Sequence, residues 1–140
     1  MTSSGEAHDA APRAVVAGHG TFAAGIISAV EQISGRGSVF AAVTNAGLDA
    51  VGLDAAMREA VARHGARVVF TDLPAGSCTI AARRCAREGA GLAVVTGANL
   101  SMLLDYALKA DDGAAAARAA ARGRDAIVVV DAGAEAGGAH

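Results

Sequence analysis

The 140-residue chain is poor in aromatic residues, lysine and cysteine, and each shortage excludes a class of function. Tryptophan is absent and aromatic residues make up 3% of the chain, too few for a surface on which nucleic-acid bases stack. Eleven arginines and Lys109 face 14 acidic residues, so there is no positive excess to neutralise a phosphate backbone. No apolar run approaches the roughly 18 residues of a membrane span. We therefore expect no direct partnership with nucleic acid or with a membrane.

The N-terminal residues and the two cysteines add further exclusions. Residues 1–12 are polar and lack the basic and then apolar pattern of a signal peptide, so we expect a flexible tail and a cytoplasmic protein. Cys78 and Cys85 would lie roughly 10 Å apart on one helix, beyond the roughly 7 Å limit for a disulfide. Because no histidine is near them in the sequence, we predict buried free thiols rather than a zinc site. We expect no metal and no other cofactor.

Short valine- and isoleucine-rich runs and helical patterns alternate along the chain, which is otherwise rich in alanine and glycine. Alternation of continuous apolar strands with helices predicts an α/β fold, with a doubly wound, mainly parallel sheet covered on both faces. The domain should span residues 13–131, with a second flexible tail at 132–140. The predicted strands are residues 13–17, 38–43, 67–71 and 92–95, with a fifth at Ile127–Val130. The predicted helices begin at Phe22, at Asp49 or Asp54, at Ser77, at Leu100 and at Ala114.

Polar side chains gather in three loops that follow predicted strands. In an open parallel sheet, ligands bind beyond the carboxyl ends of the strands. That rule selects residues 18–22, 72–77 and 96–99 as candidate site loops. The polar residues in them are His19, Asp72, Ser77, Thr96 and Asn99.

His19, Asp72 and Ser77 suggest phosphate chemistry. His19 stands between two glycines after the first strand, so its ring can project from the sheet. Asp72 ends the third strand, which usually lies beside the first, and its carboxylate can bind one imidazole nitrogen and leave the other as a nucleophile. The Ser77 hydroxyl and the N–H groups of the helix that follows suit a phosphate. The plainer alternatives are a surface histidine, a loop-capping aspartate and an ordinary helix cap.

The first of these loops also matches a dinucleotide-binding pattern, G-x-G-x-x-A, at residues 18–23. That function requires an acidic residue at the end of the second strand, where the sequence is Val43-Thr44-Asn45 and the next acid is Asp49. A single 140-residue domain also leaves no room for a separate substrate domain. A nucleotide-binding module that uses the Gly18-x-Gly20 loop is the weaker alternative.

Three stretches in this order resemble one known family. They are GHGTFAAG at 18–25, VFTDL at 69–73 with Gly76-Ser77, and VVTGANLSMLL at 94–104. The chain looks like the enzyme IIA domain of the mannose/fructose/sorbose/N-acetylgalactosamine branch of the bacterial phosphoenolpyruvate:sugar phosphotransferase system. The resemblance covers about residues 13–110.

The resemblance implies that His19 is a phosphorylated histidine. It would accept a phosphoryl group from the phosphocarrier HPr and pass it to a sugar-specific enzyme IIB for sugar uptake. Asp72 would orient the histidine, and Ser77, Gly76 and Gly20 would lie around the phosphoryl group. A regulatory relative, which signals its phosphorylation state without serving transport, is an alternative.

The resemblance also implies a homodimer whose subunits exchange the C-terminal strand, here Ile127–Val130, and an indirect membrane association through the permease complex. The third-strand loop departs from the family, which has Gly-Gly-Ser/Thr-Pro where this chain has Ala75-Gly76-Ser77-Cys78, preceded by Pro74. Ala75 would be strained only if its position required a positive φ.

Overall fold

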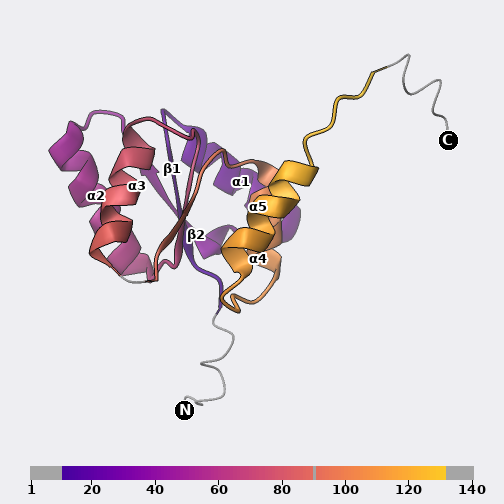
Figure 1. The fold of residues 1–140 in the computed structure, drawn as a ribbon. Helices are drawn as coiled ribbons and strands as arrows, with labels where there is room; N and C mark the ends of the chain where they lie inside the picture. The colour runs from indigo at the N-terminus through magenta and orange to yellow at the C-terminus, as the bar shows by residue number, and fades with distance from the viewer. Residues whose placement is uncertain (1–10, 90, 132–140) are drawn as a thin grey trace, which may run out of the picture.

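A four-stranded parallel sheet forms the middle layer of the protein (Figure 1). The computed structural model describes residues 11–89 and 91–131. The sheet has the order β2-β1-β3-β4, and each neighbouring pair is parallel. Its strands are β1 (Ala14–Gly18), β2 (Phe40–Thr44), β3 (Val68–Thr71) and β4 (Ala93–Val95). This arrangement confirms the predicted α/β fold with a doubly wound sheet.

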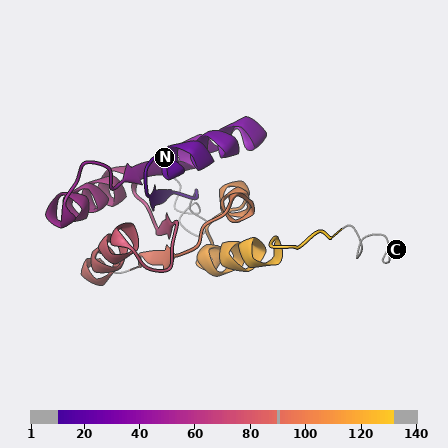
Figure 2. The ribbon, with the colours of Figure 1, turned by 90° about the horizontal axis from the view of Figure 1, so that it is seen from above.

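Five α-helices cover the two faces of this sheet, as Figures 1 and 2 show. One face carries α1 (Phe22–Ser34), α4 (Leu100–Leu108) and α5 (Ala115–Asp125). The other carries α2 (Ala50–His64) and α3 (Ser77–Glu88). A short 3₁₀ turn, η2 (Gly37–Val39), leads into β2, so this strand begins two residues later than the predicted one at residue 38.

Two hydrophobic cores follow from the alternation of side chains along the strands. Val16 and Phe70 point to the α1, α4 and α5 side, and Val15 and Val69 to the α2 and α3 side. All four are fully buried, as central strands of a parallel sheet require. Such buried side chains each contribute about 1.5–3 kcal/mol to folding.

The helix ends explain where the predicted boundaries hold and where they shift. Asp49, not Asp54, caps α2, since its carboxylate accepts the Gly52 N–H at 2.7 Å. The helix predicted to begin at Ala114 begins at Ala115 and continues to Asp125. Gly123 lies inside it because a Cβ there would come within 2.8 Å of the Met102 side chain. The missing Cβ lets α5 pack closely on α4.

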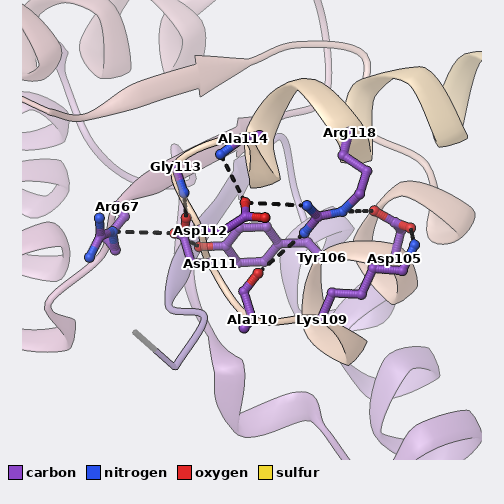
Figure 3. Close-up of polar contacts among 10 residues, drawn as sticks. All are labelled: Arg67, Asp105, Tyr106, Lys109, Ala110, Asp111, Asp112, Gly113, Ala114 and Arg118. Atoms are coloured by element: carbon purple, nitrogen blue, oxygen red, sulfur yellow. Dashed lines mark hydrogen bonds and ion pairs between the residues drawn. The ribbon is translucent and has the colours of Figure 1, made fainter. Parts of the chain in front are cut away.

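A polar cluster at the amino ends of the strands fixes the chain that follows α4 (Figure 3). The buried Tyr106 hydroxyl lies 3.0 Å from the Arg13 carbonyl oxygen and 3.2 Å from Asp111 Oδ2. Arg67 Nε pairs with the same Asp111 oxygen at 3.3 Å. Burial and the neighbouring Asp111 charge raise the pKa of Tyr106. The phenol therefore stays protonated and ties the sheet to this loop.

A second set of charges joins α4 to α5 in the same view (Figure 3). The Asp105 carboxylate is buried between Lys109 Nζ, at 2.7 Å, and Arg118 Nε, at 3.5 Å. Arg118 also donates to Asp112 Oδ1 and to the Ala110 carbonyl. Both clusters lie at the edge of the sheet opposite to His19, so they stabilise the fold without entering the candidate site.

The segment after α5 differs from its prediction. Residues 127–130 form no strand within the chain and run away from the domain (Figures 1 and 2). Their four side chains, Ile127, Val128, Val129 and Val130, are 69–87% exposed. The sheet edge at β4 is not reached by this segment, so the exchange of a fifth strand between subunits stays a prediction. The predicted tails at 1–12 and 132–140 lie outside the described residues, apart from positions 11 and 12.

Two further findings bear on the predictions from composition. In the described ranges, no helix has both the length and the apolar character to cross a membrane. Cys78 and Cys85 are free and buried within α3, as predicted from their spacing.

Candidate active site

The strand order brings three loops together at the carboxyl edge of the sheet. Because β1 lies between β2 and β3, His19 has Asn45 on one side and Asp72 on the other. The chain passes from β1 to β2 in one direction and later reaches β3 in the other, so β1 and β3 flank the point where the winding reverses. Ligands of doubly wound sheets bind at this point.

A single carboxylate oxygen holds His19 in place. Asp72 Oδ2 accepts the His19 backbone N–H at 2.9 Å and lies 2.8 Å from the ring Nδ1. An ionised carboxylate can only accept hydrogen bonds, so Nδ1 carries a proton, and in the neutral form of the ring Nε2 has the free lone pair. The His19 side chain is 49% exposed, whereas that of Asp72 is 14% exposed. The arrangement presents an oriented imidazole to the surface.

The charge of Asp72 depends on these contacts. Burial by itself raises the pKa of Asp72, but the hydrogen bonds from the His19 backbone and ring, together with the ring's charge, lower it below its ordinary value. Asp72 is therefore an anion at neutral pH and can compensate a positive charge on the ring.

Gly18 allows Asp72 to approach the start of the histidine loop. A Cβ at Gly18 would lie 2.6 Å from the Phe22 ring and 3.0 Å from Asp72 Cγ. Contacts between side chains of the protein itself therefore account for the glycine at position 18. These contacts give no support to the nucleotide-binding alternative.

The start of α3 lies against the histidine ring. Gly76 has φ 126° and precedes the helix, and its Cα hydrogens face His19, since a Cβ there would be 3.5 Å from Cε1. That conformation strongly favours glycine. The prediction of Ser77 as a helix cap is wrong: Gly76 occupies the cap position, and Ser77 is the first helical residue. The Ser77 hydroxyl therefore makes no capping hydrogen bond to this helix.

Buried threonines fix the loop between β3 and α3. The Thr79 hydroxyl donates to Thr71 Oγ1 at 2.7 Å, and both side chains are fully buried. This contact sets the position of α3 relative to the end of β3, and so of Ser77 relative to Asp72. Ala75 has no positive φ, so the replacement of the family's glycine there causes no backbone strain.

Two residues at the end of β2 escaped the sequence analysis. Thr44 Oγ1 donates to the Gly20 carbonyl at 2.9 Å, and Asn45 Nδ2 donates to Ser77 Oγ at 3.2 Å. Both follow a predicted strand, so the rule that selected the other loops applied to them as well. Gly20, with φ 55°, has open space around it on the exposed side of this loop.

Other polar residues from the sequence analysis are held elsewhere. Asn99 caps α4 by accepting the Met102 N–H at 3.0 Å, and it donates to the Gly123 carbonyl at 2.9 Å. His64, at the end of α2, lies 2.7 Å from the Val39 carbonyl oxygen through Nε2. Among residues 11–89 and 91–131, no group of three His, Cys, Asp or Glu side chains is placed to hold a metal ion.

The fold and this edge define a class of protein: a small doubly wound α/β domain with an exposed histidine oriented by a carboxylate at its switch point. The family model described as "PTS system fructose IIA component" matches residues 13–122. The chain belongs to this family, the mannose-type IIA components of the sugar phosphotransferase system, and is thus a phosphotransferase component.

Solved structures share the same fold. The mannose/sorbose-specific IIA subunit of the phosphotransferase system from Enterococcus faecalis superposes with a TM-score of 0.75 at 21% identity, covering 86% of this chain and 95% of that one. The IIA component from Streptococcus agalactiae gives 0.69 at 24% identity, covering 87% and 98%. The IIA protein associated with the fucose utilization operon of Streptococcus pneumoniae gives 0.75 at 20% identity, covering 84% and 92%. No curated protein matches the chain.

Proposed function

We propose that the chain is a phosphohistidine carrier that accepts a phosphoryl group from HPr on Nε2 of His19 and passes it to an enzyme IIB. The observation that carries the proposal is the double contact of Asp72 Oδ2 with the backbone and Nδ1 of His19. This contact supports a proton on Nδ1 and a role for Nε2 as the nucleophilic atom. Family membership supports the same reaction type.

The transfer needs no group beyond the two proteins. The lone pair of Nε2 attacks the phosphorus, the P–N bond to the HPr histidine breaks, and its electron pair returns to that ring. His19 then carries a phosphoryl group on Nε2 and a proton on Nδ1. The resulting positive ring charge lies against Asp72 Oδ2, at the 2.8 Å contact. In the second step the enzyme IIB acceptor attacks the same phosphorus, and the pair of the P–Nε2 bond returns to Nε2.

The start of α3 supplies donors to the phosphoryl oxygens. The first backbone bond of this helix runs from the Ile80 N–H to the Gly76 carbonyl, so the N–H groups of Ser77, Cys78 and Thr79 have no partner within the helix. Together with the helix dipole they stabilise negative charge. A Cβ at Gly76 would lie 3.5 Å from Cε1 of His19, the carbon between the two ring nitrogens, which supports an approach of the helix start to the phosphoryl group. Ser77 adds its hydroxyl.

The proposal includes a homodimer formed by exchange of Ile127–Val130. Four consecutive apolar side chains, 69–87% exposed, are costly to leave in water, and a strand position on another subunit would bury them. The mannose-type assembly then meets the membrane only through its permease partner.

Intact-mass measurement tests the carrier function. The protein is incubated with phosphoenolpyruvate, enzyme I and HPr, and an acid-labile adduct with the mass of one phosphoryl group is expected. His19→Ala should abolish it, whereas His64→Ala, at the far end of α2, should leave it intact. An adduct that persists in His19→Ala would overturn the proposal.

Onward transfer separates the remaining alternatives. Loss of the adduct on addition of a mannose-family enzyme IIB supports the transport role. Retention with every IIB tested would indicate the regulatory alternative. A thermal shift with NAD or NADP and no phosphorylation would indicate the nucleotide-binding alternative.

A further inference from the structure

Asn45, just after β2, contacts the start of α3 in the candidate site. It follows β2 directly, is half-buried, and its Nδ2 lies 3.2 Å from Ser77 Oγ. Ser77 is 32 residues further along the chain, so this contact is made by the tertiary fold.

The contact determines what the Ser77 hydroxyl can do. A hydroxyl has one proton to donate and two lone pairs that accept. When the Asn45 amide donates into one lone pair, the Ser77 proton is directed away from Asn45. It is then available to an acceptor on the other side, where the ring of His19 lies against Gly76. A phosphoryl oxygen on Nε2 is such an acceptor.

The end of β2 connects the histidine loop to the start of α3 through the side chains of two successive residues. Successive side chains of a strand point to opposite faces. Thr44 accordingly reaches the Gly20 carbonyl in the histidine loop at 2.9 Å, and Asn45 reaches Ser77 at the start of α3. Thr44 also accepts the Ala46 N–H at 3.1 Å, which fixes the turn. The two residues tie the loop that presents the nucleophile to the helix that receives the phosphoryl oxygens.

We propose that Asn45 is a positioning residue for phosphoryl transfer, which orients the Ser77 hydroxyl as a donor to the phosphoryl group on His19. The proposal rests on the proposed function. Asn45 touches no reacting atom itself, and its effect passes entirely through Ser77. This gives it a signature that a structural role lacks: its effect should vanish when the Ser77 hydroxyl is absent.

A double-mutant cycle tests this signature. The rate of phosphorylation by phospho-HPr is measured by rapid quench for wild type, Asn45→Ala, Ser77→Ala and the double variant. One oriented hydrogen bond to a charged group corresponds to about 10-fold in rate, so we expect Ser77→Ala to slow transfer about 10-fold and Asn45→Ala about 3- to 10-fold. The double variant should be no slower than Ser77→Ala.

Asn45→Asp sharpens the test. A carboxylate at this position accepts the Ser77 proton instead of donating to its oxygen, and it repels the phosphoryl group. We expect this variant to be slower than Asn45→Ala when Ser77 is present. Gln32→Ala is the control: it removes an exposed amide near the C-terminal end of α1, away from His19, and should leave the rate unchanged. Urea denaturation confirms that each variant is folded under the assay conditions.

Each outcome supports or overturns the proposal. An Asn45→Ala rate within twofold of wild type overturns it, as does an equal slowing by Asn45→Ala in the presence and absence of the Ser77 hydroxyl. A wild-type protein that is never phosphorylated on His19 overturns both this inference and the proposed function. Phosphorylation of wild type with no effect at position 45 overturns this inference alone.

Discussion

Replacing Asp72 with asparagine is the most direct test of how the site works. The substitution keeps the shape of the side chain but removes its charge, which lies 2.8 Å from Nδ1 of His19. In the proposed reaction, a positive charge develops on the ring beside Asp72 as the ring becomes phosphorylated. The substitution therefore weakens the phosphorylated state and the transition state that leads to it, more than the resting protein.

The magnitude follows from the exposure of the pair. Unit charges 4 Å apart interact by about 1 kcal/mol in water and about 4 kcal/mol near a protein surface. His19 is 49% exposed and Asp72 14% exposed, so solvent screening reduces the upper figure, and about 1–3 kcal/mol remains. This corresponds to a loss of about 5- to 150-fold in the rate of phosphorylation. The asparagine amide can also donate to Nδ1, which moves the proton to Nε2 and removes the nucleophile.

Rapid-quench measurement of transfer from phospho-HPr gives the rate, and ¹⁵N NMR of the imidazole reports which ring nitrogen is protonated. Asp54→Asn is the matched control, because Asp54 pairs with Arg84 on the α2–α3 surface at 3.0 Å and does not contact His19. We expect wild-type rates for the control and a slower Asp72→Asn. An Asp72→Asn rate equal to that of wild type would refute the role of the carboxylate.

Three further predictions concern stability and assembly. Gly18→Ala should destabilise the fold by about 1–3 kcal/mol in urea denaturation, because the new Cβ would lie 2.6 Å from the Phe22 ring. Gly25→Ala is the control: its Cβ would meet no atom within 4 Å, so it should stabilise the fold by about 0.5–1 kcal/mol. The pKa of Asp72 is lower in the folded protein than the ordinary value of about 3.9. The stability that Asp72 adds over Asp72→Asn should therefore be complete above about pH 5 and shrink as the pH falls through the folded-state pKa. Deletion from Ile127 onward should convert dimers to monomers in light scattering.

Each of these predictions has an outcome that contradicts it. Equal effects of the two alanine substitutions would show that the close contact at Gly18 relaxes without cost. A stability difference that stays constant from neutral pH to about pH 3 would show that the Asp72 charge adds nothing to folding. Dimers that persist after the deletion would place the interface elsewhere, and monomers of the full chain would exclude the exchange.

Much of the fold was predictable from local pattern alone. Continuous valine runs such as Val68-Val69-Phe70 are typical of buried parallel strands, and the glycines after them end the elements cleanly. Helix boundaries were predicted less well, because they depend on packing between distant segments. Gly123 lies inside α5, where a Cβ would come within 2.8 Å of the Met102 side chain of α4, a contact that no local pattern reveals.

The sequence by itself determined that His19 and Asp72 follow strands and that a helix starts near Ser77, because the ends of strands are marked by the change from apolar to polar residues. Only the tertiary structure decided how they meet. The strand order puts β1 between β2 and β3, which brings Asp72 onto Nδ1 of His19 and also brings in Asn45. Gly76, with its positive φ, occupies the cap position, so the Ser77 hydroxyl does not cap α3. The contacts of His19 with Asp72 and of Asn45 with Ser77 are not local, since they join residues 53 and 32 positions apart. They depend on the pairing of strands, which no short pattern encodes.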